Sequence, residues 1–227
     1  MSRILVILTI LTMFGGMVFG QGADLQNNWC RAGLFAEFEG QFKAASVLSR
    51  RNERVNFRDD DRPECPGASD CRKKSYLTNG DPLVIGRQIN GFACGWFTSR
   101  AGKVTVGWLP IAKLKIIRTN LNPSLRLWLG DWVQSDNSIS FTENKLAGFL
   151  NVTGDAYWKG IGDNVHIGEL DSREEPAGNV ILYNNADQSE YACKAKMQLL
   201  GEHLVVKDNQ RCGGANVTFS GVYRKRR

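Results

Sequence analysis

Six cysteines and two histidines are the residues of this sequence best suited to nucleophilic or metal chemistry. The cysteines are Cys30, Cys65, Cys71, Cys94, Cys193 and Cys212. A thiol hydrolase needs a free cysteine beside a histidine, and the two histidines are His166 and His203. Zinc sites commonly use C-x-x-C pairs, which this sequence lacks, and both histidines lie away from the cysteines along the chain. We expect neither a catalytic thiol nor a metal site.

Hydroxyl and carboxylate chemistry has equally little support. The serines form no G-x-S-x-G nucleophile elbow, and no glycine-rich phosphate loop leads from a strand into a helix. Four carboxylates that a glycosidase could use cluster at Glu169, Asp171, Glu174 and Glu175. They are interrupted by Arg173 and followed by Pro176, so we interpret them as a solvated acidic loop. We therefore predict that the protein is not an enzyme and carries no cofactor.

Three consecutive aspartates, residues 59–61, suggest calcium at first sight. A helix-loop-helix calcium site spaces its oxygen ligands and ends in a distal glutamate, and this run does neither. Arg58 and Arg62 flank the aspartates and would oppose a bound cation. A solvated loop is the preferred interpretation.

The N-terminal residues have the pattern of a secretory signal peptide. Arg3 precedes an apolar run over residues 4–14, and a V-F-G sequence ends at Gly20. The run is shorter than the roughly 20 residues that span a bilayer, so an uncleaved membrane anchor is the less favoured alternative. We predict a signal peptide over residues 1–20, no transmembrane segment after its removal, and export to the periplasm or beyond.

An exported chain with an even number of cysteines is expected to form disulfides. Six cysteines allow fifteen pairings, but the chain divides near residue 118, which leaves four on one side and two on the other. The pair on the second side is then forced. On the first side we prefer pairs that close successive loops without crossing. The expected bonds are Cys193–Cys212, Cys30–Cys65 and Cys71–Cys94.

Length and composition predict a folded, mainly β protein. The chain has 227 residues, of which 42% are hydrophobic and 23% charged, and this composition differs from that of a disordered protein. Short β-rich runs alternate with turn signals such as Asn79-Gly80 and Asn90-Gly91. Apolar residues spaced by threes and fours between Leu34 and Ala45 predict a short helix, in an N-terminal segment over residues 21–54.

Residues 55–118 carry a family resemblance. The motifs are residues 71–77 with Tyr76, then Asn79-Gly80-Asp81, residues 91–94, and a G-W-L strand within residues 103–110. This order resembles a bacterial SH3-type domain of exported proteins. The resemblance implies a small five-stranded barrel that binds peptides or cell-wall fragments and has no chemistry of its own. It also places Cys94 on the middle strand, where a bond to Cys71 would pin the barrel.

A linker over residues 119–124 leads to a second set of strands, residues 125–227. Gly130-Asp131-Trp132 near its start and Arg224 near its end resemble the G-x-W and basic residue of lipocalin-related (calycin-like) barrels. The resemblance implies an antiparallel barrel in which Trp132 fills the closed end and Arg224 caps the indole as a cation. The end of the chain also resembles that of uncharacterised exported bacterial proteins, which indicates a compartment and no activity.

The basic residues point to an acidic partner. The formal charge is +6, and the cations gather at residues 72–74, at residues 113–118 and in the tail, residues 224–227. Peptidoglycan, anionic lipid headgroups and an acidic protein are all compatible, as is a basic surface without a dedicated ligand. Aromatic side chains of the first domain could line a peptide groove, although the core is preferred for Trp108. The candidate binding residues are Tyr76, Trp96, Trp108, Arg72, Lys73 and Lys74.

These observations lead to three functional hypotheses. The first is a non-catalytic exported protein that recognises a cell-wall peptide or another envelope component. The second is an immunity or inhibitor protein that neutralises a secreted toxin attacking the cell wall or lipid. The third and least favoured is a cell-wall hydrolase. Export argues against nucleic acid as a partner, and the oligomeric state is left open.

Overall fold

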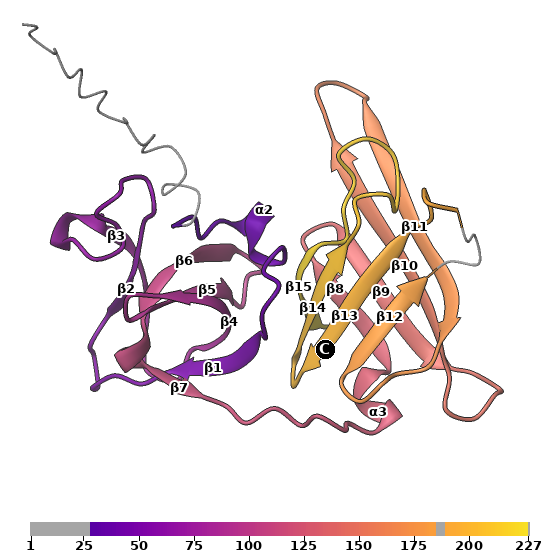
Figure 1. Ribbon diagram of the computed structural model, residues 1–227, viewed down its shortest axis with the longest axis horizontal. Helices are drawn as coiled ribbons and strands as arrows, with labels where there is room; N and C mark the ends of the chain where they lie inside the picture. Colours follow the sequence, from indigo (N-terminus) through magenta and orange to yellow (C-terminus); the bar gives the residue numbers. More distant parts are fainter. Residues whose placement is uncertain (1–27, 185–188, 227) are drawn as a thin grey trace, which may run out of the picture.

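The computed structural model describes residues 28–184 and 189–226. Its regular structure is almost entirely antiparallel β-sheet, arranged as two sheets that lie side by side (Figure 1). The prediction of a mainly β fold with a short N-terminal helix is therefore confirmed. Within the described residues no helix is long and apolar enough to cross a membrane. The predicted signal peptide and Arg227 lie outside the described residues.

The first sheet, in the unit formed by residues 28–117, has seven strands in the order β3-β2-β6-β5-β4-β1-β7. The strands are β1 (Lys43–Val47), β2 (Val55–Arg58), β3 (Arg72–Leu77), β4 (Pro82–Ile89), β5 (Phe92–Thr98), β6 (Val104–Pro110) and β7 (Leu114–Ile116). The 3-10 helices η1 (Ser69–Cys71) and η2 (Ile111–Lys113) connect some of them. Buried side chains from all seven strands meet in one core, so the sheet curls around it. The SH3 resemblance implies five strands, and the sheet has two more.

Local turn chemistry explains the hairpin between β4 and β5. Ile89 pairs with Phe92, which leaves Asn90 and Gly91 as a two-residue turn. Both residues have positive φ, at 44° and 81°, and asparagine and glycine tolerate this conformation best. The Asn-Gly signal in the sequence therefore marks a real hairpin.

The N-terminal segment differs from the prediction. A helix of one turn, α2 (Ala32–Phe35), takes the place of the longer helix expected up to Ala45. Residues 43–47 instead form β1, which pairs with both β4 and β7. Tertiary pairing overrides the local helical spacing here, because β1 fills a place in the sheet that no other strand occupies. The first unit therefore begins well before residue 55.

The second sheet is an eight-stranded, nearly closed barrel in the order β11-β10-β9-β8-β15-β14-β13-β12. Its strands are β8 (Gly130–Gln134), β9 (Asn137–Glu143), β10 (Leu150–Lys159), β11 (Val165–Glu174), β12 (Val180–Asn184), β13 (Lys194–Leu200), β14 (His203–Asp208) and β15 (Gly221–Lys225). The short helix α3 (Leu125–Trp128) precedes β8. The edge strands β11 and β12 approach each other, and Asp171 donates its backbone N–H to the Tyr183 hydroxyl at 3.0 Å.

Aromatic side chains fill the interior of this barrel. Trp128, Trp132, Phe141, Phe219 and Tyr223 are all fully buried. Trp132 donates its indole N–H to the Trp128 carbonyl at 2.8 Å, and the Tyr223 hydroxyl donates to the Phe219 carbonyl at 2.9 Å. These bonds satisfy polar groups that burial would otherwise leave without water. The barrel interior is a packed core.

The cation beside Trp132 is Lys225, and the assignment of Arg224 to this role is wrong. Lys225 lies directly opposite Trp132 in the strand pairing, with its ammonium 5.4 Å from the ring centroid. Neighbouring residues of a strand point to opposite faces, so a register one residue away from the expected one changes which cation meets the ring. Arg224 instead donates from Nη1 to the Thr98 carbonyl of the first unit at 3.1 Å.

The two units pack directly against each other. Phe35, Phe42 and Trp96 of the first unit share a hydrophobic cluster with Val205 and Val222 of the barrel. Strands β14 and β15 face the first unit, and the linker runs past the junction to α3 (Figure 1). Lys207 also pairs with Glu37 at 3.4 Å and with Glu39. The junction is thus an apolar contact with polar links at its margin.

Candidate binding groove between the two units

The predicted aromatic groove is wrong, because its two tryptophans belong to the core. Trp96 is 2% exposed and packs on Phe35, with ring centroids 5.5 Å apart. Trp108 is 0% exposed and donates its indole N–H to the Asn28 carbonyl at 2.7 Å. The preferred core position of Trp108 is therefore confirmed. Neither ring can meet a ligand without unfolding of the junction.

The remaining candidate residues lie on β3, at the edge of the first sheet. Arg72, Lys74 and Tyr76 share its exposed face, and Lys73 points to the other side. Arg54 places its guanidinium 4.4 Å from the centroid of the Tyr76 ring. Charged residues on an edge strand also discourage pairing with other chains, so this strip has a structural explanation. Its role in binding stays a prediction.

All six cysteines form disulfides. Cys193–Cys212 is confirmed, but the first unit is stapled by Cys30–Cys94 and Cys65–Cys71, so the two pairs preferred there are wrong. The segment before α2 packs against β5, which brings Cys30 to Cys94 with Cα atoms 5.4 Å apart. The assumption that disulfides close successive loops without crossing could not reveal this contact. No thiolate is available as a nucleophile while these bonds are intact.

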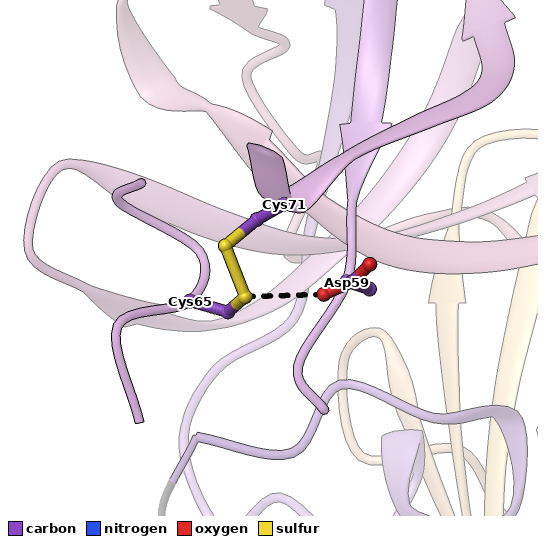
Figure 2. Close-up of side chains that lie close together, drawn as sticks. All are labelled: Asp59, Cys65 and Cys71. Carbon is purple, nitrogen blue, oxygen red and sulfur yellow. Dashed lines mark hydrogen bonds between the residues drawn. A yellow bond between two sulfur atoms is a disulfide. The ribbon is translucent and has the colours of Figure 1, made fainter. Parts of the chain in front are cut away.

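Asp59 and the Cys65–Cys71 bond form a compact group (Figure 2). An Asp59 carboxylate oxygen lies 3.1 Å from the Cys65 sulfur. Both sulfurs are already bonded to each other and carry no thiolate charge, so the group does not offer the ligand set of a zinc site. The arrangement is a disulfide with a carboxylate packed against it.

The aspartate run is only partly solvated, which corrects the loop prediction at Asp60. Asp60 is 4% exposed, and its carboxylate accepts the Cys30 backbone N–H at 2.7 Å and the Arg31 Nε–H at 3.1 Å. Asp61 receives Arg31 at 3.2 Å from the solvent side. The run therefore anchors the residues before α2 to the rest of the first unit. Arg31 forms ion pairs with both Asp60 and Asp61 and so balances part of their negative charge.

The four carboxylates predicted to form a loop lie mainly on β11, which corrects that interpretation. Glu169, Asp171 and Arg173 alternate along the exposed face of the strand. Glu174 turns the other way and accepts from the Ser172 hydroxyl at 2.8 Å and the Asn184 N–H at 3.2 Å. Strand geometry distributes the carboxylates along an outer surface, which is unlike the facing pair of a glycosidase.

The histidines lie at packed positions of the barrel. His166 contacts the Ala215 carbonyl through Nδ1 at 2.6 Å and stacks beside Trp158. His203 is buried, and burial lowers its pKa to about 4, assisted by the charge of Arg224 and opposed by Glu202. An imidazole with so low a pKa stays neutral near pH 7.

A large hollow lies where the two units meet. A cavity of about 950 Å³ is bounded on the first unit by residues 79–82 and 97–102 and on the barrel by the β8–β9 turn, residues 133–136. Ser99, Gln134 and Ser135 give these walls a polar character. Because both units contribute walls, the cavity depends on their packing.

A second cavity of about 500 Å³ adjoins the first beneath the linker. Residues 117–120 cover one side of it, and residues 199–202, the turn between β13 and β14, form another. Glu202, Arg224 and Lys225 line both cavities. We call the two cavities together the interunit groove.

Basic side chains border the smaller cavity from two directions. Arg118 lies just before the linker, and Arg224, Lys225 and Arg226 belong to β15 and the residue after it. In the sequence these cations belong to two separate basic clusters. The fold brings them together, and the sequence carries no local signal for that meeting because it depends on how the units dock.

Comparison of the chain with protein-family models, with curated proteins and with solved structures finds no match. The resemblances to SH3-type and calycin-like domains therefore stay predictions.

Proposed function

We propose that this chain is an exported, non-catalytic binding protein that recognises a component of the cell envelope, with the interunit groove as its ligand site. The observation that carries the proposal is that two cavities, walled by both units, adjoin at Glu202, Arg224 and Lys225. Ligand sites occur preferentially at interfaces between domains, where neither fold has to sacrifice its own core.

The disulfides support this proposal in two ways. Three disulfide bonds suit an oxidising compartment outside the cytoplasm. They also stiffen the elements behind the groove, since Cys30–Cys94 ties the N-terminal segment to β5, whose last residues reach the larger cavity. A wall that is ordered in advance loses little conformational entropy when a ligand binds.

Retention on purified peptidoglycan sacculi tests the proposal. Ala101 is an exposed alanine that lines the larger cavity, and Ala101→Trp should fill the space that a ligand needs. Ala112, an exposed alanine on η2 outside the lining, provides the matched control Ala112→Trp. We expect sacculi to retain the wild type and Ala112→Trp, and to retain Ala101→Trp at least fivefold less. Equal retention of both variants, or no retention of the wild type at low salt, would contradict the proposal.

One further observation favours the inhibitor hypothesis as a second candidate. The hairpin of β10 and β11 projects beyond the other strands (Figure 1). Ile161 at its tip is 100% exposed, between Gly160 and Gly162, and Tyr157 and Ile167 are exposed neighbours on the two strands. Exposed apolar residues on a protruding element are typical of protein contacts.

Inhibition of wall-degrading enzymes separates the two candidates. If the hairpin enters the active site of a hydrolase, wild type should slow sacculus lysis and Ile161→Asp should not. Leu182→Asp removes another exposed apolar side chain, on β12, and serves as the control. Loss of inhibition in Ala101→Trp, with Ile161→Asp still active, would assign the effect to the groove.

A further inference from the structure

The smaller cavity of the interunit groove combines an apolar lining with a cationic border. Ile117 and Leu127 are 44% and 49% exposed, and they lie beside the buried Leu200. Covering exposed aliphatic side chains at the wall of a cavity with a ligand is favourable, because it removes apolar surface from water. The lining thus favours a ligand with an apolar group.

The border favours a negative charge on the same ligand. Four cationic residues, Arg118, Arg224, Lys225 and Arg226, line this cavity together with one acidic residue, Glu202. Within the described residues Arg118 has no ion-pair partner, and Arg226 has only a distant one, with Asp131 at 4.0 Å. Their excess charge attracts an anion that enters the cavity.

The cations retain donors for that anion. Arg224 uses one guanidinium nitrogen for the Thr98 carbonyl, and Lys225 uses its ammonium for the Leu127 carbonyl at 3.2 Å. A guanidinium has five N–H donors and an ammonium has three. The remaining donors of these side chains are available to a carboxylate in the cavity that Arg118 also lines.

The lining of the adjoining larger cavity indicates which class of ligand bears the carboxylate. Its walls present hydroxyl and amide groups, among them Ser99, Gln134 and Ser135. A simple acyl chain laid across these groups would remove them from water without returning hydrogen bonds, which is unfavourable for each buried group. A peptide backbone offers both donors and acceptors along its length.

We infer that the smaller cavity binds the C-terminal carboxylate and apolar last side chain of a peptide whose preceding residues occupy the larger cavity. This inference rests on the proposed function and names the ligand chemistry of the same groove. Arg118 and Arg226 hold the carboxylate, and Ile117 and Leu127 cover the last side chain. Because the cations are partly solvated, binding weakens as salt increases.

Fluorescence anisotropy with labelled pentapeptides ending in alanine, valine or leucine tests the inference. Each peptide is prepared with a free C-terminal carboxylate and with a C-terminal amide. We expect the acids to bind the full-length mature protein at least tenfold more tightly than the amides. Arg118→Glu should abolish this preference, whereas Lys145→Glu, an equal charge change at an exposed position between β9 and β10 and outside both cavities, should leave it intact.

The outcomes distinguish this inference from the proposed function. If sacculi retain the protein through the groove but acids and amides bind equally, the carboxylate assignment is wrong and the proposed function stands. If dodecanoate displaces the peptides and itself binds more tightly than any of them, the peptide assignment is wrong. If Lys145→Glu weakens binding as much as Arg118→Glu, the attraction is a general effect of surface charge and the inference fails. Thermal unfolding of each variant verifies that it is folded.

Discussion

Buried ionisable groups show how single residues serve this fold. Asp208 is 4% exposed, and its carboxylate accepts the Phe219 N–H at 2.7 Å, the Thr218 hydroxyl at 2.9 Å and the Ser220 hydroxyl at 3.0 Å. These bonds hold the segment before β15 against the end of β14. Three donors satisfy oxygens that burial would otherwise leave without the hydrogen bonds of water.

His203 gives a prediction at the same scale. Its pKa is lowered from the ordinary 6.5 to about 4, first by burial and then by Arg224. As pH falls from 6.5 towards 4, the unfolded chain gains a proton that the folded protein resists, so the free energy of unfolding decreases. Below pH 4 the free energy of unfolding is lower by about 3 kcal/mol, and above pH 6.5 His203 does not lower it.

Chemical denaturation of the wild type and His203→Leu at pH 7 and pH 3.5 measures this effect. The stability difference between the two proteins should shift by about 3 kcal/mol in favour of the variant at the lower pH. Other titrating groups change the stability of both proteins alike, so their effects cancel in the difference. A constant difference across the range would show that His203 titrates normally in the folded state.

At the scale of elements, the disulfides predict unequal effects on stability. Cys30–Cys94 links residues 64 apart in the sequence, whereas Cys65–Cys71 links residues 6 apart. A bond that closes the longer loop removes more conformational entropy from the unfolded chain. Replacing both cysteines of the Cys30–Cys94 pair by serine should therefore cost about 2 kcal/mol more than the same change at Cys65–Cys71. Urea unfolding of the two double variants compares them, and a reversed order would refute the loop-entropy account.

Elements with local signals could be predicted from the sequence, and those set by docking could not. The Asn90-Gly91 turn specifies its hairpin because both residues accept positive φ. The Cys193–Cys212 pair followed from a correct division of the chain. The partner of Cys30, the strand β1 and the cation beside Trp132 differ from the predictions, because each depends on a contact across the fold that residue spacing does not encode. Arg118 and Arg226 line one cavity for the same reason, so the groove became visible only in the structure.

At the scale of the whole molecule, β14 contributes to two cores at once. Val205 is buried in the cluster that joins the units, and Val206 is buried in the barrel interior. The alternation of side chains along a strand makes this double use possible. Opposite faces of one strand thus stabilise the barrel and its docking.

This double use predicts the unfolding behaviour of Val205→Asp. A charge buried at the junction without a partner should weaken docking by several kcal/mol and leave the barrel interior unchanged. Calorimetry should record one cooperative transition for the wild type and two for Val205→Asp. Val206→Ala should lower the transition temperature of the barrel instead. A single transition in Val205→Asp at an unchanged temperature would mean that the junction contributes little to stability.

The three disulfides have a consequence for how the molecule is made. Two of them close within residues 30–94 and the third within residues 193–212, and none joins the two units. Chains are synthesised from the N-terminus, so the first four sulfurs can all find their partners before Cys193 emerges. Oxidation can then proceed in two successive stages without exchange between them. A delay in the first stage would be the main source of scrambled, wrongly paired chains.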